Sequence, residues 1–142
     1  MKRIQLLVAL AALTAIPLVA QSPVVVKWVA PKYSDIAALA RISASVEAKI
    51  WVAKNGKVES VEIGASSLPQ VKVFHQALVE SLAKWEFQPG RAGEFILDVA
   101  YHIFPPATPD KDIKPEFYPP NALVIRRKFV KIEPTSDPLP DK

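Results

Sequence analysis

Apolar and polar residues alternate along two neighbouring stretches, roughly residues 44–53 and 57–64, on either side of Asn55-Gly56. Asn-Gly is the pair that a type I′ turn favours, because both central residues of that turn need positive φ. The pattern therefore predicts a β-hairpin, with a longer loop or a bulge at Val58 to relieve mismatches beside the turn. The pairs that this register places opposite each other are Ile50 with Val61, Ala48 with Ile63, and Lys49 with Glu62.

The hydrophobic period changes from two to between three and four after the hairpin, which predicts an amphipathic helix. Ser66-Ser67 and Pro69 are typical of a helix start, and Pro89-Gly90 ends the pattern. Polar residues fill the opposite side of this helix. The apolar stripe is formed by Val71, Phe74, Leu78, Leu82 and Trp85. We expect Trp85 to anchor the core rather than contact a partner, because it ends this stripe.

Strict alternation returns after Gly93 and predicts a third strand with one buried side. The apolar face of this strand carries Phe95, Leu97, Val99, Tyr101 and Ile103, and the other face carries Asp98, Ala100 and His102. Three strands and one helix in the order β-β-α-β predict an α+β fold with a three-stranded antiparallel sheet. A right-handed crossover gives the sheet order 2-1-3, with the helix on one face.

This arrangement leaves the third strand, Glu94 to Phe104, at the edge of the sheet. An open edge presents unpaired N–H and C=O groups that an extended chain can satisfy. We therefore expect a partner-binding strand edge formed by Ile96, Leu97, Asp98, Val99, Ala100, Tyr101 and His102.

The order of several short motifs adds a family resemblance over roughly Pro31 to Phe104. These motifs are Tyr33, Ala37-Ala38 and Arg41-Ile42, Asn55-Gly56-Lys57-Val58, Val61-Glu62-Ile63, Ser66-Ser67, and Lys84-Trp85-Glu86-Phe87-Gln88-Pro89-Gly90. In this order they resemble the C-terminal domain of TonB, the periplasmic protein that grips outer-membrane transporters. The resemblance implies a short helix before the hairpin. It also implies capture of an extended segment of an outer-membrane transporter, or of another envelope protein, on the last strand.

Two departures from the family pattern change what the resemblance implies. The chain has Pro31-Lys32-Tyr33-Ser34 where the family often has a tyrosine followed by prolines, and Ser43-Ala44 where a glycine often enters the first strand. Only residues 21–30 separate the apolar N-terminus from the domain, and ten extended residues reach at most ~36 Å. We expect this short linker to prevent complete energy transduction by this chain alone.

The N-terminus predicts export. Lys2-Arg3 precede an apolar run that ends in small residues, which is the layout of a secretory signal, so residues 1–20 are expected to be removed after Ala20. An uncleaved inner-membrane anchor is the alternative, because the run is only slightly shorter than a spanning helix. The expected compartment is the periplasm, where a chain with no cysteine must hold together by core packing alone.

Composition separates a small domain from a tail. Nine of the 14 prolines follow Phe104, so residues 105–142 form a proline-rich tail, with a possible extra strand at 122–132. Two readings of that strand stay open: it folds back on the open edge of the domain, or it is a free basic binding segment. The formal net charge of +4 includes Lys2 and Arg3, which leaves +2 without the signal, so nucleic acid is not an expected partner.

Catalysis, cofactors and metals have little support in the sequence. The two histidines, His75 on the helix and His102 on the last strand, stand apart from any nucleophile or clustered carboxylate. Asp98 lies ~13 Å from His102 along a strand, so the two do not form a dyad. We expect a non-enzymatic binding domain with no cofactor and no metal. The alternative is a structural or self-associating envelope protein, a homodimer included, whose edge is filled by its own tail or by another copy.

Overall fold

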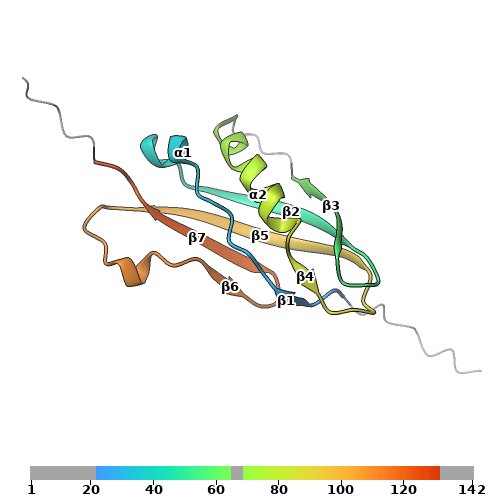
Figure 1. The fold of residues 1–142 in the computed structure, drawn as a ribbon. Helices are drawn as coiled ribbons and strands as arrows, with labels where there is room; N and C mark the ends of the chain where they lie inside the picture. The colour runs from blue at the N-terminus through green and yellow to red at the C-terminus, as the bar shows by residue number, and fades with distance from the viewer. Residues whose placement is uncertain (1–21, 65–68, 132–142) are drawn as a thin grey trace, which may run out of the picture.

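The computed structural model describes residues 22–64 and 69–131 of the chain. The apolar N-terminus with its expected cleavage point and the Ser66-Ser67 helix start lie outside these ranges. The elements follow the chain in the order shown in Figure 1: β1 (Val25–Lys27), α1 (Asp35–Leu39), β2 (Ala44–Val52), β3 (Val58–Ile63), η1 (Pro69–Phe74), α2 (His75–Leu82), β4 (Glu86–Phe87), β5 (Gly93–Phe104), η2 (Asp110–Asp112), β6 (Glu116–Tyr118) and β7 (Ala122–Lys128).

The sheet has five strands in the order β3-β2-β5-β7-β6, and both helices lie over one of its faces (Figure 1). Its first three strands reproduce the predicted order and directions. The prediction of a three-stranded sheet is wrong, because the tail supplies β7 parallel to β5 and then β6 antiparallel to β7. The fold class is α+β, as expected.

The hairpin register is confirmed. Ile50 pairs with Val61, Ala48 with Ile63 and Lys49 with Glu62, while the register shifts between Trp51 and Val52. That shift is the irregularity predicted beside Val58, which pairs with Val52. The predicted type I′ turn is wrong: among the described residues Arg41 is the non-glycine residue with positive φ, so Asn55 lacks the positive φ that this turn requires. The loop is longer than two residues, as the alternative expected: the Ala53 amide donates to the Lys57 carbonyl and the Gly56 amide to the Ala53 carbonyl, both at 2.9 Å. Gly56 alone in this loop is left-handed, with φ +83°.

The predicted helix is present, but its first part is a 3₁₀ helix. Pro69–Phe74 forms η1, and α2 continues from His75 to Leu82. The five residues of the apolar stripe are all buried, and Trp85 is 1% exposed. Its indole Nε1 donates a hydrogen bond to the Val29 carbonyl at 2.9 Å, which gives the buried ring its polar partner. Trp85 is therefore a core anchor.

The short helix α1 begins at a serine cap. The Ser34 hydroxyl accepts a hydrogen bond from the Ala37 amide at 3.3 Å, which satisfies one of the free N–H groups of the first turn. Ala37 and Ala38 are fully buried and let the helix approach the sheet closely. In this way α1 covers the same face of the sheet as α2.

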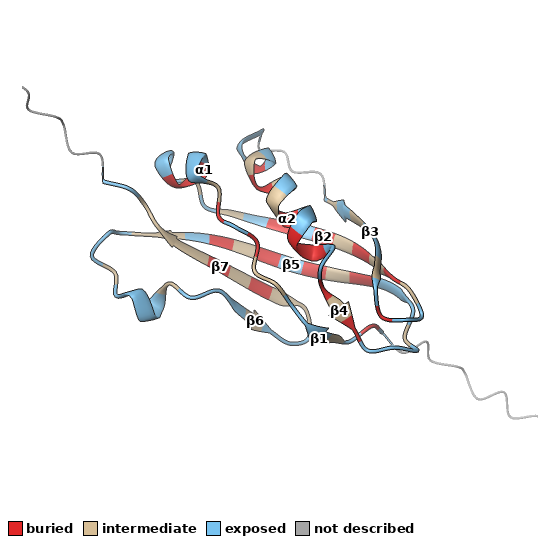
Figure 2. Cartoon of the chain, viewed as in Figure 1, coloured by how far each residue is buried: buried red, intermediate tan, exposed pale blue. Residues whose placement is uncertain are grey.

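One hydrophobic core lies between the helices and the sheet (Figure 2). Buried residues alternate along the three central strands, as the period of two demands: Val46, Ala48, Ile50 and Val52 on β2, Phe95, Leu97, Val99 and Tyr101 on β5, and Leu123 and Ile125 on β7. The tail thus contributes to the core.

The expected linker, residues 21–30, also contains structure, since β1 pairs with β4 in a separate two-stranded sheet.

Candidate functional site: the β5 edge and the tail strand

The predicted partner-binding edge is the side of β5 that faces away from β2. The structure shows β7 along this side, in parallel register from Asp98 with Ala122 to Phe104 with Lys128. Backbone bonds mark both ends of the pairing: the Asp98 amide donates to the Asn121 carbonyl at 2.9 Å, and the Phe129 amide donates to the Phe104 carbonyl at 3.0 Å. The prediction that Glu94 to Phe104 is an open edge is wrong, because the main-chain groups of its second half are paired with the tail.

The predicted site residues differ in the face of the sheet on which their side chains lie and in whether β7 covers their backbone. Their side chains alternate, so Leu97, Val99 and Tyr101 are buried in the core while Asp98 and His102 are exposed on the outer face. Ile96 and Ala100 are half-buried on that outer face. From Asp98 to His102 the strand is covered by β7, so a partner can add to these residues only if the tail leaves.

The beginning of β5 extends past the start of β7. Within the described residues, no strand pairs with Glu94 or Ile96 on the side where β7 lies. The Ile96 carbonyl points to this side, since it accepts a hydrogen bond from the Asn121 side-chain amide at 3.1 Å. Because backbone groups alternate along a strand, Glu94 presents its N–H and C=O to the same side. A short open length of edge therefore remains.

The tail strand is held from the core side by apolar packing. Leu123 is 0% and Ile125 3% exposed. On the neighbouring β6, the Phe117 ring lies edge-on to Trp85, with centroids 5.5 Å apart. Full burial of a residue such as Leu or Ile contributes about 1.5–3 kcal/mol. The tail strand is thus a stable part of this conformation.

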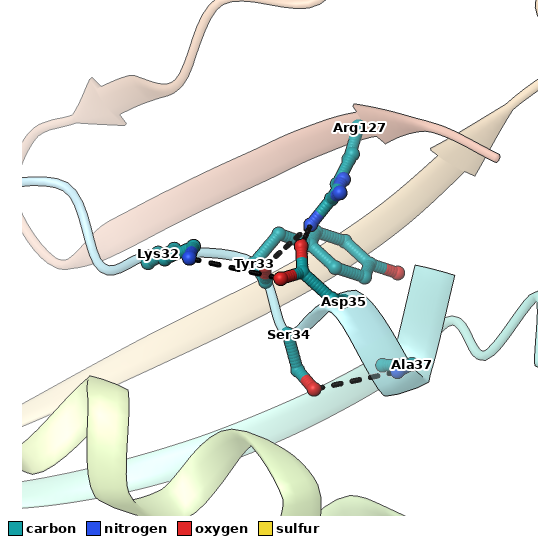
Figure 3. A network of polar contacts seen from close by, with 6 residues as sticks. All are labelled: Lys32, Tyr33, Ser34, Asp35, Ala37 and Arg127. Carbon is teal, nitrogen blue, oxygen red and sulfur yellow. Dashed lines mark hydrogen bonds and ion pairs between the residues drawn. The ribbon is translucent and has the colours of Figure 1, made fainter. Parts of the chain in front are cut away.

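A charged contact joins the tail strand to α1 (Figure 3). The Arg127 Nη1 donates to the Tyr33 carbonyl at 2.8 Å and to Asp35 Oδ1 at 2.6 Å. Lys32 Nζ lies 3.7 Å from the other carboxylate oxygen of Asp35. The hydrogen bond from Arg127, and then the charge of Lys32, lower the pKa of the Asp35 carboxyl. Arg127 therefore connects β7 to the N-terminal end of the helix layer.

The two neighbouring cations of β7 are satisfied inside the tail itself. Arg126 Nη1 donates to the Lys114 carbonyl at 2.9 Å and lies 3.6 Å from Glu116. Lys128 Nζ contacts Asp110 Oδ1 at 2.5 Å, and this hydrogen bond lowers the pKa of the Asp110 carboxyl. Each of the three consecutive basic residues thus has its own acidic partner. Of these three ion pairs, the one between Arg127 and Asp35 joins the tail to the rest of the domain.

The outer face of the sheet carries a shallow hollow of about 430 Å³ beside the covered edge. Small side chains form it, because β2, β5 and β7 present Ser45, Ala100 and Ala122 here. Glu47 and Asp98 stand directly opposite each other at its rim. Two like charges in this position destabilise a sheet, since they lie within about 5.5 Å of each other at Cβ.

Two of the remaining titratable side chains have buried polar atoms. Tyr101 Oη and His75 Nε2 are buried and have no hydrogen-bond partner among the described residues. Burial raises the pKa of the Tyr101 hydroxyl well above its usual value, with a smaller contribution from Tyr33. His102 is exposed on β5. In the described ranges, no group of three or more His, Cys, Asp or Glu residues is placed to hold a metal ion.

Sequence reasoning missed the residues that fix the tail. Asp35, Asn121 and Arg127 make polar contacts with residues 25 to 94 positions away in the sequence, and no local sequence pattern predicts contacts at such separations. The available signal was the apolar alternation of Leu123 and Ile125, which Arg127 continues at the same spacing.

Within residues 22–64 and 69–131, no helix is long and apolar enough to span a membrane.

A comparison with family models identifies the family of this chain. The profile described as the Gram-negative bacterial TonB protein C-terminal matches residues 29–103, just over half of the chain. Such domains are non-enzymatic interaction modules of the bacterial envelope that contact outer-membrane transporters. The chain belongs to the TonB C-terminal domain family. A search of curated proteins finds no match.

Proposed function

We propose that this chain is a periplasmic TonB-like domain that binds an extended segment of an envelope protein by strand addition, as an accessory to transport across the outer membrane. The family match supports the class of partner. The single observation that carries the mode of binding is that β5 accepts a parallel strand along the side that faces away from β2. A strand site that the chain fills with its own tail is chemically able to hold a strand of similar pattern.

The proposed location is the periplasm, after export by the N-terminal signal and cleavage behind Ala20. The sequence layout of residues 1–20 supports export. The partner is proposed to be an outer-membrane transporter, whose extended segment would supply main-chain hydrogen bonds to the side of β5 at Ile96 to His102. Backbone pairing would give affinity, and the alternate side chains of the segment would give specificity.

A second candidate function is favoured by the same tail. In this reading the chain is a structural envelope protein whose sheet edge is permanently closed by β6 and β7, and self-association replaces transporter binding. The buried Leu123 and Ile125 favour it, because a strand that contributes to the core is costly to release.

A capture experiment separates the two functions. The chain starting at Gln21 is immobilised and exposed to detergent-solubilised outer membrane, and bound proteins are identified by mass spectrometry. Retention of an outer-membrane transporter, reduced by an excess of soluble chain, is the expected result. Dimers in light scattering with no transporter retained would contradict the leading proposal and support the second. The control is the same column carrying the heat-unfolded chain.

A further inference from the structure

We infer that β7 is a built-in competitor for the strand site, and that its side-chain pattern specifies the segment able to replace it. This inference rests on the proposed function. The replacing segment is an extended chain that runs parallel to β5, with branched apolar side chains at two alternate positions and an arginine at the third. The corresponding positions of the tail are Leu123, Ile125 and Arg127.

The tail strand β7 occupies the side of β5 where a partner strand would add. The family match ends at residue 103, so β6 and β7 lie wholly outside it. These added strands occupy the side of the last matched strand, from Asp98 to Phe104. A partner that adds a strand here meets an occupied site, and its apparent affinity falls by the fraction of chains in which the site is free.

Three alternate side chains of β7 contact the rest of the domain. Leu123 and Ile125 enter the core and Arg127 meets the Asp35 carboxylate and the Tyr33 carbonyl. An incoming strand with the same three side chains restores all of these contacts when the tail leaves. Exchange between the two strands is then close to balanced, apart from the contact of Phe117 on β6 with Trp85 and the advantage that attachment gives the tail. A strand without this pattern leaves the core open and the Asp35 carboxylate without its arginine.

A reversible crosslink tests whether the tail must leave. Ala100 and Val124 are register partners on the outer face, and the chain has no cysteine of its own, so A100C/V124C can fasten β7 to β5. The probe is a fluorescent synthetic peptide of residues 120–130. We expect the reduced protein to bind this peptide at least about tenfold more tightly than the oxidised protein. K49C/E62C, which fastens β2 to β3 toward the opposite edge of the sheet, is the matched control and should bind equally in both states.

A pair of arginine variants tests the proposed pattern. Arg127→Gln weakens the hold of the tail but leaves Asp35 and Tyr33 free to receive the arginine of the peptide. This variant should bind the peptide about tenfold more tightly than the unchanged chain. Arg126→Gln is the control, because Arg126 is bonded within the tail, and it should leave peptide binding unaltered. A peptide that itself carries Arg127→Gln should lose the gain.

The outcomes separate this inference from the proposed function. Equal peptide binding by the oxidised and reduced A100C/V124C protein would overturn the inference, as would transporter capture by the oxidised form. In the second case the proposed function would stand and its site would be elsewhere. Peptide exchange that depends on reduction, together with no transporter capture by any form, would support exchange of β7 and overturn the proposed function.

Discussion

At the scale of single residues, Gly56 is a position where a methyl group has no room. Its φ is +83°, and an added Cβ would lie 2.0 Å from the Phe87 carbonyl oxygen. Gly56→Ala should therefore lower the free energy of unfolding by about 3 kcal/mol or more, because strain and overlap act together. Gly90 has φ +87° and nothing within 4 Å, so Gly90→Ala should cost only about 1 kcal/mol. Equal losses in chemical denaturation would contradict this explanation.

The facing carboxylates of Glu47 and Asp98 give a prediction of opposite sign. Removing one of two like charges on adjacent strands should stabilise the sheet, so Glu47→Gln is expected to raise the free energy of unfolding by about 0.5 kcal/mol at low ionic strength. The gain should shrink in 1 M salt, where charges are screened beyond about 3 Å. Glu62→Gln is the control, because Glu62 faces Lys49 and should not stabilise the chain.

At the scale of elements, the tail strand is expected to behave as part of the core. Leu123→Ala removes a side chain that is 0% exposed and should cost about 2–5 kcal/mol in urea or thermal unfolding. Val124→Ala changes the neighbouring residue on the outer face, where the side chain is half-buried, and should cost less than about 1 kcal/mol. Similar values for the two variants would show that β7 does not belong to the cooperative unit.

The contact between β7 and α1 should depend on pH in the acid range. The pKa of the Asp35 carboxyl is lowered in the folded chain, so the unfolded chain binds more protons there. The stabilisation is complete above the ordinary aspartate value of about 4 and is lost as the pH falls through the lowered pKa. The difference in unfolding free energy between the unchanged chain and Asp35→Asn should therefore shrink between about pH 4 and pH 2. A difference that grows in this range would contradict the assignment.

At the scale of the whole molecule, export gives the simplest measurement. We expect the intact mass of the protein recovered from the periplasm to lack residues 1–20. The charged, apolar and small-residue parts of the N-terminus predict cleavage behind Ala20. A full-length product that fractionates with the inner membrane would instead support the anchored alternative.

Sequence alone could predict the elements whose signals are local. The alternation on either side of Asn55-Gly56 predicted the hairpin register, although the turn type was wrong, and the apolar stripe that ends at Trp85 located the helix. Of the two readings of the tail strand, the structure confirms that it folds back on β5. Local patterns could not decide between them, because the parallel pairing spans a long connection. The tail is rich in proline, but its apolar residues predicted a possible strand at 122–132, and β7 forms there with Leu123 and Ile125 in the core.

The uneven lengths of β5 and β7 have a kinetic consequence. Strand β5 has 12 residues and β7 has seven, so the length from Glu94 to Ile96 precedes the paired region. An incoming chain that runs parallel to β5 would pair first with this uncovered length and then displace β7 one residue pair at a time. The Asn121 side chain, bonded to the Ile96 carbonyl, is the first obstacle on that path. Replacement of the tail would then resemble unzipping from one end, with no stage at which the sheet loses both strands.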